Sequence, residues 1–292
     1  MKEQLRLIIT TMRLKQWIKN IFVFAALVFD RQLFFLNPFL ITALAALLFG
    51  LVSSLGYLIN DLADIKADQK HPKKQHRPLA SGNLSKSSAI IAIFILALIV
   101  FPASFALAFE FGLILSCYFF LMLAYSLWLK RIPLMDVMII ATGFVLRVAA
   151  GVVIINIDMF SPWLFVATTF LALFIALGKR RSELVLLQAG AQEHRKVLQG
   201  YTKEFLDQLL TIVMSATLMT YCLYTFSSPI SPENHGMMLT IPFVIYGLFR
   251  YLYLLRIKQI GGAPEEVLLS DRHMQLTIGL WSLTVIIILY FL

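Results

Sequence analysis

Long, uninterrupted runs of apolar residues dominate the hydrophobic pattern of this chain, as in the eleven-residue run IIAIFILALIV at 90–100. A helix needs about 20 mostly apolar residues to cross the roughly 30 Å hydrocarbon core of a bilayer. The strands of an outer-membrane barrel would alternate polar and apolar residues instead. The pattern therefore predicts an all-α, polytopic membrane protein with one transmembrane domain over 1–292 and nine spanning helices, at 17–36, 39–59, 87–108, 112–129, 134–156, 160–177, 206–226, 237–255 and 274–292.

Composition agrees with this class of protein. Of the 292 residues, 60% are hydrophobic, whereas a soluble domain carries roughly half. The two cysteines, Cys117 and Cys222, lie inside apolar runs, which argues against a disulfide or a zinc site and predicts small core residues. No small-residue cleavage site follows the first apolar run, so we expect no cleaved signal peptide.

Positive charge is distributed unevenly between the two sides of the predicted bundle. Of the 25 Lys and Arg residues, all except Arg31 and Arg147 fall in the N-terminal segment, in the alternate loops 60–86, 130–133, 178–205 and 256–273, or in the stretches that flank these. Lys and Arg concentrate on the cytoplasmic side of membrane proteins. We therefore expect a cytoplasmic N-terminus and an external C-terminus in a bacterial-type inner (plasma) membrane.

Most acidic residues lie in the same loops as the basic ones. A transporter would be expected to place ionisable groups near the membrane midplane. The concentration of charge at one surface instead favours an enzyme that acts on a water-soluble reagent and a lipid at the cytoplasmic face.

The most informative segment is Asn60-Asp61-Leu-Ala-Asp64-Ile-Lys-Ala-Asp68, directly after the second predicted span. Spacings of three and four residues place these side chains on one face of a helix. Carboxylates packed in this way repel one another and require a cation, and Mg²⁺ is the hard ion that carboxylates bind together with water and substrate phosphates. The alternative is a solvated acidic helix end, stabilised by Lys66 and Lys70.

Basic residues precede and follow this acidic segment. Lys73, Lys74 and Arg77 are candidates to neutralise phosphate oxygens, and the alternative is the ordinary basic excess of cytoplasmic loops. Lys15 and Lys19 are four residues apart and are expected on one helix face, and the alternative is a simple topological anchor.

A further group of polar residues lies around the fifth predicted span. Asp136 begins this span and Arg147 follows eleven residues later, which places Arg147 on the same side of the helix and roughly 16 Å further into the membrane. A guanidinium at that depth is costly. We interpret Arg147 as the partner of an acid or of a phosphate, and the alternative is a side chain that snorkels from the edge of the span. Glu265 and Glu266 follow a proline and are explained by the start of a helix.

Together these residues resemble the UbiA superfamily of intramembrane prenyltransferases. The resemblance rests on the motif from Asn60 to Asp68 and on the Arg-Pro-Leu-Ala-Ser-Gly sequence that begins at Arg77. It implies a nine-helix bundle with an active-site cavity that faces the cytoplasm. The second aspartate-rich motif that is usual in these enzymes is missing, and the corresponding region offers Tyr125, Lys130 and a single acid, Asp136.

The full set of motifs resembles one branch of the superfamily, the decaprenyl-phosphate phosphoribosyltransferases. The elements that narrow the resemblance to this branch are Lys-Gln-Trp at 15–17, Tyr-Ser-x-x-Leu-Lys at 125–130 and Pro-Glu-Glu at 264–266. The resemblance implies transfer of 5-phosphoribosyl from 5-phosphoribosyl-1-diphosphate to a polyprenyl (decaprenyl-type) phosphate. Pyrophosphate would be released with Mg²⁺ as cofactor, and the product would serve as a lipid-linked pentose donor for cell-envelope glycans. The alternative is prenyl transfer to an aromatic acceptor. No nucleic-acid partner is expected, and self-association of the chain is left open.

The resemblance also implies roles for individual residues. The implied metal ligands are Asn60, Asp61, Asp64 and Asp68, and the implied catalytic residues are Asp61, Asp64, Asp136 and Arg147. Binding of substrate and phosphate is implied for a larger and mainly basic set: Lys15, Lys19, Asn60, Lys73, Arg77, Tyr125, Lys130, Arg147, Lys179 and Arg180.

Overall fold

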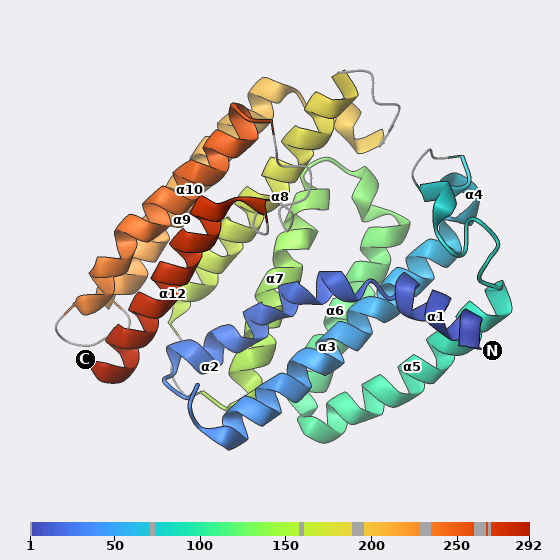
Figure 1. The fold of residues 1–292 in the computed structure, drawn as a ribbon, viewed down its shortest axis with the longest axis horizontal. Helices are drawn as coiled ribbons and strands as arrows, with labels where there is room; N and C mark the ends of the chain where they lie inside the picture. Colours follow the sequence, from blue (N-terminus) through green and yellow to red (C-terminus); the bar gives the residue numbers. More distant parts are fainter. Residues whose placement is uncertain are drawn as a thin grey trace. The chain divides into compact units, whose positions relative to one another are not determined.

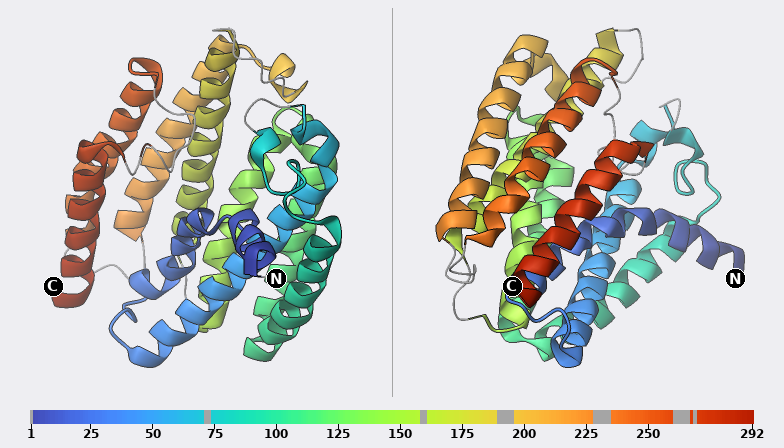
Figure 2. Two further views of the ribbon diagram at one scale, coloured as in Figure 1. Left: turned by 45° about the vertical axis from the view of Figure 1, so that its right-hand side comes forward. Right: turned by 60° about the vertical axis from the view of Figure 1, so that its left-hand side comes forward.

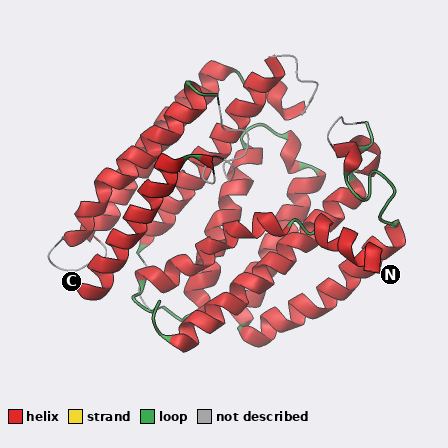
Figure 3. Ribbon diagram, in the orientation of Figure 1, coloured by secondary structure: helices red, strands yellow, loops and turns green. Residues whose placement is uncertain are grey.

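The computed structural model describes residues 2–70, 74–157, 161–188, 196–227, 235–259, 267 and 270–292. All regular structure in these residues is helical, as Figure 3 shows. Several large apolar side chains are exposed, among them Phe94, Leu98 and Phe291 at 72%, 77% and 73%. Because water would penalise this surface and lipid does not, the exposure agrees with an all-α membrane protein.

Eight helices are long and apolar enough to cross a membrane in the described part of the chain. They are α3 (Leu36–Ala63), α5 (Lys86–Leu107), α6 (Phe109–Leu127), α7 (Met135–Ile154), α8 (Pro162–Gln188), α9 (Lys203–Ser227), α10 (Ile241–Arg256, preceded by the 3₁₀ helix η5, Gly236–Thr240) and α12 (Arg272–Phe291). Each corresponds to one of the spans predicted from the second onwards, and the helix ends differ by a few residues in most cases.

The first predicted span, 17–36, has a different form. A short helix, α1 (Lys2–Thr11), precedes a 3₁₀ helix, η1 (Leu14–Phe24), which continues as α2 (Ala25–Phe29). At about 2.0 Å per residue in a 3₁₀ helix and 1.5 Å in an α-helix, η1 and α2 together extend about 30 Å. That length suffices to cross the hydrocarbon core, but the count of nine spans is not confirmed.

The sixth predicted span ends too early, since α8 continues from 177 through the basic residues to Gln188. Arg180 and Arg181 are 1% and 3% exposed, and each is paired with an acidic side chain. Because these charges are neutralised inside the protein, they do not end the helix.

The chain divides into two compact units, which are described separately. Unit 1 comprises Met1–Leu27, Gln32–Lys130 and Leu146–Ile157. In it α3 packs against α5, α6 and η1, around an apolar core that includes Phe49, Phe111 and Leu115. Figures 1 and 2 show α3 and α5 side by side.

Small residues bring the helices of unit 1 close together. A Cβ atom added to Gly151 of α7 would lie 2.1 Å from the Val23 carbonyl oxygen of η1. A Cβ atom added to Gly50 of α3 would lie 2.7 Å from the Trp17 ring. The absence of a side chain at these two positions therefore allows η1 to lie directly on both helices.

Unit 2 comprises Val28–Arg31, Arg131–Val145 and Asp158–Leu292. Here α8 packs along α9, and α10 packs against α12 (Figure 1). Its core includes Phe174, Leu210, Tyr251 and Leu255. The expectation that both cysteines are core residues is wrong, because Cys117 is exposed and Cys222 of unit 2 is only half-buried.

Candidate active site

The acidic segment of unit 1 lies where α3 ends. The helix stops at Ala63, and Asp64 leaves helical geometry with φ −92° and ψ 6° before α4 (Ile65–Asp68) begins. The Asp64 amide still donates to the Asn60 carbonyl oxygen at 2.9 Å, and the Asp68 amide donates to the Asp64 carbonyl oxygen at 2.8 Å. The predicted spacing of four residues therefore survives the break, although the segment is not one continuous helix.

Basic side chains contact all three carboxylates of this segment. Arg77 Nη1 lies 3.1 Å from Asp61 Oδ1 and 2.7 Å from Asp68 Oδ2, so one nitrogen contacts both acids. Lys130 Nζ lies 3.0 Å from Asp64 Oδ2 and 3.5 Å from Asn60 Oδ1. The structure thus brings the predicted residues Asn60, Asp61, Asp64, Asp68, Arg77 and Lys130 together.

Arg13 is a member of this cluster that we did not assign to the site from the sequence. Its Nη2 lies 2.5 Å from Asp61 Oδ1, and its guanidinium lies 4.9 Å from the centre of the Tyr57 ring. Asp61 is only 3% exposed, so two guanidinium groups compensate one buried carboxylate. Arg13 belongs to the same basic stretch as Lys15 and Lys19, but nothing in its spacing singled it out.

The cluster also allows a chemical test of metal binding. Its four predicted ligands offer only carboxylate and amide oxygens, which are the hard donors that Mg²⁺ prefers. However, no three His, Cys, Asp or Glu side chains in the described residues are arranged to hold a metal ion. Because Mg²⁺ commonly uses one or two carboxylates together with waters and substrate phosphates, the donor set fits this ion as part of a substrate complex.

Arg147 lies in unit 1 and is buried, with 5% exposure. Its Nε donates to Asn20 Oδ1 at 3.0 Å, and its Nη2 donates to Tyr118 OH at 2.9 Å and Ser53 Oγ at 3.3 Å. The rings of Phe49 and Tyr118 each lie 4.8 Å from the guanidinium. Arg147 therefore joins η1, α3, α6 and α7, and its burial among these partners argues against the alternative of a snorkelling side chain.

Asp136 lies in unit 2, where it is fully buried. Arg180 Nε lies 2.5 Å from Asp136 Oδ2, and Arg180 Nη1 lies 2.6 Å from Glu183 Oε2. The Tyr201 hydroxyl donates to Asp136 Oδ1 at 2.7 Å and accepts from the Leu134 amide at 2.6 Å. Two predicted residues, Asp136 and Arg180, are thus brought into one buried network, to which Glu183 and Tyr201 also belong.

The network around Asp136 fixes both a backbone conformation and a protonation state. Leu134 has φ +68°, in the left-handed region that non-glycine residues rarely adopt, and its amide is held by Tyr201. Burial, together with the hydrogen bond to Asp136, raises the pKa of Tyr201 above its ordinary value of 10.0. The phenol therefore remains neutral and remains a donor at physiological pH.

The remaining predicted residues are placed differently. Lys15 is exposed and Lys19 half-buried, and both lie on η1. The prediction that they share a helix face is wrong, because residues four apart in a 3₁₀ helix point about 120° away from each other. Tyr125 and Lys179 are half-buried. Lys73, Glu265 and Glu266 lie outside the described residues.

Asp271, to which we assigned no role, begins the last helix. Its carboxylate accepts from the Met274 amide at 2.9 Å and pairs with Arg250 at 2.8 Å. The hydrogen bond from Arg250 lowers the pKa of Asp271. These contacts connect α10 to the start of α12 and account for this residue within unit 2.

Comparison with known proteins identifies the family. The sequence profile of the UbiA prenyltransferase family matches residues 20–266, which is most of the chain. The chain belongs to the UbiA prenyltransferase family. The resemblance inferred from the motif at Asn60 to Asp68 is thereby confirmed.

Two curated relatives match almost the full chain. The decaprenyl-phosphate phosphoribosyltransferase of Corynebacterium glutamicum is 33% identical, over 97% of this chain and 86% of its own length. The protein of the same name from Mycolicibacterium smegmatis is 32% identical, over 97% of this chain and 92% of its own.

Solved structures confirm the UbiA fold. The structure of a UbiA homologue from Archaeoglobus fulgidus bound to DMAPP and Mg²⁺ matches with a TM-score of 0.71 and 18% identity, over 99% of this chain and 100% of the other. A structure described as digeranylgeranylglyceryl phosphate synthase in membranes matches with a TM-score of 0.69 and 17% identity. The all-α bundle predicted from the apolar runs is therefore that of the UbiA family.

Proposed function

We propose that this chain transfers the 5-phosphoribosyl group of 5-phosphoribosyl-1-diphosphate to a polyprenyl phosphate and releases pyrophosphate. The names of its relatives in Corynebacterium and Mycolicibacterium support this reaction. The observation in the structure that supports it best is the charge of the site, where Arg13, Arg77 and Lys130 surround three carboxylates. Transfer between two phosphorylated substrates needs positive charge of this kind to hold two anions together.

The chemistry of the nucleophile is consistent with this site. The phosphate of a polyprenyl phosphate is already ionised near neutral pH, so no general base is required. Catalysis then depends on positioning and on electrostatic stabilisation of the leaving diphosphate. The guanidinium groups of Arg13 and Arg77 and the ammonium of Lys130 would neutralise phosphate oxygens, and Arg can do so with two parallel bonds.

We propose Mg²⁺ as the cofactor, held by Asp61, Asp64 and Asp68 with Asn60 beside them. The ion, when bound, acts as a Lewis acid that neutralises charge on the departing pyrophosphate. The three carboxylates already attract cations, as their pairing with Arg13, Arg77 and Lys130 indicates. Phosphate groups of the substrate would compete for these same basic side chains and so free carboxylate oxygens for the metal.

Asp136, Arg180 and Arg147 have a different role in this proposal. Asp136 and Arg180 are 0% and 1% exposed and are paired with each other. Arg147 is enclosed by neutral oxygens and aromatic rings. Their burial supports positioning roles, in which they hold the helices that carry residues in contact with substrate. The positive-inside charge pattern supports a cytoplasmic site, with a cytoplasmic N-terminus and an external C-terminus.

The decisive experiment is to mix purified protein with radiolabelled phosphoribosyl diphosphate, decaprenyl phosphate and Mg²⁺, and to extract the lipid. We expect label in the organic phase, and we expect a chelator to abolish this transfer. Asp64→Asn should lower the rate by at least about 100-fold, a typical loss when one electrostatic contact to the transition state is removed. Because the Asp64 side chain is 31% exposed, the melting temperature of the Asp64→Asn protein should differ little from that of the wild type.

Glu110→Gln is the matched control, since Glu110 is an exposed acid at the start of α6, outside the cluster. This variant should transfer label at the wild-type rate. If wild-type protein instead consumes polyprenyl diphosphate and an aromatic acid, and transfers no phosphoribosyl label, the proposal is wrong and the chain is an aromatic prenyltransferase.

A further inference from the structure

A separate charged cluster joins α8, α9 and α10 in unit 2. Asp207, in the second turn of α9, contacts Arg181 Nε at 2.7 Å and Arg256 Nε at 3.1 Å. Arg256 Nη2 also donates to the Asp207 carbonyl oxygen at 3.0 Å and to Thr211 Oγ1 at 3.3 Å. Because one carboxylate serves two guanidinium groups, the cluster has an excess of one positive charge. None of these residues takes part in the proposed transfer.

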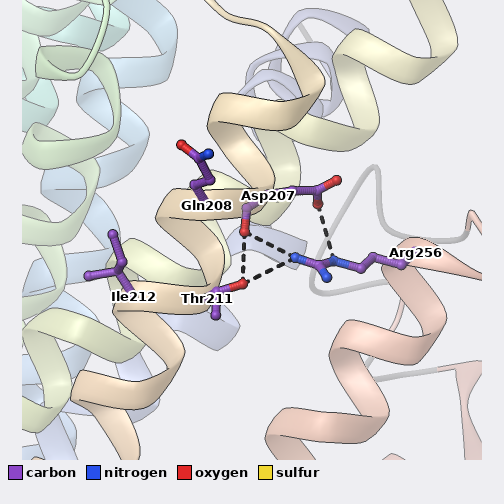
Figure 4. A pocket seen from close by; sticks show the side chains of 5 residues that line it. All are labelled: Asp207, Gln208, Thr211, Ile212 and Arg256. Carbon is purple, nitrogen blue, oxygen red and sulfur yellow. Dashed lines mark hydrogen bonds and ion pairs between the residues drawn. The ribbon is translucent and has the colours of Figure 1, made fainter.

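This excess charge lies beside an open surface cavity of about 490 Å³ with a mainly apolar lining, formed by Asp207, Gln208, Thr211, Ile212 and Arg256. Figure 4 shows the guanidinium of Arg256 among these side chains, with one nitrogen that has no dashed line. Nη2 of Arg256 donates both of its hydrogen bonds, Nε lies 3.1 Å from Asp207 Oδ1 as an ion pair without forming a hydrogen bond, and Nη1 donates none to the described residues. Gln208 is exposed, and its side-chain amide also makes no hydrogen bond within them. The cavity therefore offers one cationic and one neutral donor.

The cavity lies at the ends of two helices that are long and apolar enough to cross a membrane. Arg256 is the last residue of α10, and Asp207 lies near the start of α9. From the cavity along α9, three apolar side chains are exposed at intervals of seven residues: Ile212 (63%), Met219 (63%) and Phe226 (50%). An interval of seven is close to two helical turns, so these side chains form one stripe on a single face of α9.

We propose that this cavity binds the phosphate headgroup of an anionic phospholipid of the bilayer, whose acyl chains lie along the stripe of Ile212, Met219 and Phe226. Basic pockets between membrane helices bind anionic headgroups in this way, and a guanidinium matches the geometry of a phosphate. The uncompensated charge explains a preference for an anionic over a zwitterionic lipid. Lys203 and Glu204, exposed at the start of α9, offset each other.

The test titrates purified protein in neutral detergent with phosphatidylglycerol or phosphatidylcholine and counts bound lipids by native mass spectrometry. Gln208→Glu adds a carboxylate to the cavity wall and removes none of the bonds of Arg256. We expect it to weaken phosphatidylglycerol binding about five-fold, the effect of about one charge beside an anionic headgroup. Phosphatidylcholine binding should be weaker in the wild type and unchanged in the variant.

Lys258→Gln is the matched control, because it changes the net charge by the same amount on an exposed side chain that does not line the cavity. It should retain wild-type phosphatidylglycerol binding. Equal binding of the two lipids, or wild-type lipid binding in Gln208→Glu, would overturn the proposal. Displacement of phosphatidylglycerol by inorganic phosphate would also overturn it, since the cavity would then take a soluble phosphate. None of these outcomes depends on phosphoribosyl transfer.

Discussion

At the scale of single residues, Arg147 poses the clearest question, because a buried guanidinium can serve either substrate or structure. Its bonds to Asn20, Ser53 and Tyr118 favour structure. Arg147→Met should remove these bonds, leave the Asn20 oxygen unsatisfied and lose the contacts with two aromatic rings. We expect a loss of roughly 2–4 kcal/mol in stability, measured as a lower melting temperature in detergent.

Arg147→Lys provides the comparison, because lysine keeps the charge but loses the planar fork of donors. It should unfold at a temperature between those of the wild type and Arg147→Met. If both variants melt like the wild type and neither transfers phosphoribosyl groups, then Arg147 contacts substrate, and the structural interpretation fails.

Tyr201 gives a second prediction at this scale. Tyr201→Phe removes a hydrogen bond to the buried Asp136 carboxylate and the acceptor of the Leu134 amide. The expected cost is about 1–3 kcal/mol in unfolding free energy. Tyr246→Phe, at a position with 45% exposure and no such bonds, should be neutral. Equal stability of the two variants would mean that the hydrogen bonds of Tyr201 in the network around Asp136 contribute nothing to the unfolding free energy.

The pH dependence of this effect follows from the raised pKa of Tyr201. The folded protein holds the phenolic proton more tightly than the unfolded chain, whose tyrosine titrates near 10.0. The stabilisation is therefore fully present below pH 10.0 and is lost as pH rises through the higher pKa of the folded state. The stability difference between wild type and Tyr201→Phe should narrow only above pH 10.0, as measured by denaturant titrations over that range.

At the scale of elements, hydropathy predicted the helices well because lipid requires continuous apolar surface and satisfied backbone bonds. It failed where neighbouring helices decide the outcome. The 3₁₀ form of η1 separates Lys15 from Lys19, and α8 continues past Lys179 because Asp136 and Asp207 neutralise its arginines. The pairing of Arg13 with Asp61 could not be predicted either, since it joins residues 48 positions apart.

The close contact between η1 and α7 gives a prediction for these elements. Gly151→Ala would place a methyl group 2.1 Å from the Val23 carbonyl oxygen, so the two helices must separate. We expect a loss of about 1–3 kcal/mol, typical of overpacking. Gly56→Ala, in α3, meets no atom within 4 Å and should be neutral or stabilise the helix by up to about 1 kcal/mol. Thermal unfolding of the two variants tests this, and equal melting temperatures would show that η1 accommodates the methyl group.

At the scale of the whole molecule, the number of spans fixes the side on which the chain ends. The eight long helices alone would return the C-terminus to the side of the N-terminus. A ninth crossing by η1 and α2, which together extend about 30 Å, would place the C-terminus on the opposite side. The charge bias predicts this ninth crossing, because without it the basic loops would not all lie on the side of the basic N-terminal segment.

We therefore expect alkaline phosphatase fused after Leu292 to be active in cells, since this enzyme matures only outside the cytoplasm. A green fluorescent protein fused at the same position should be dark, since it fluoresces only inside the cytoplasm. A fusion after Lys258, in a predicted cytoplasmic loop, should give the opposite pair of signals. If both fusion sites report the cytoplasm, α12 does not cross the membrane. If both patterns are reversed, then η1 and α2 do not span the bilayer, and the acidic cluster at the end of α3 faces the outside, away from any cytoplasmic supply of phosphoribosyl diphosphate.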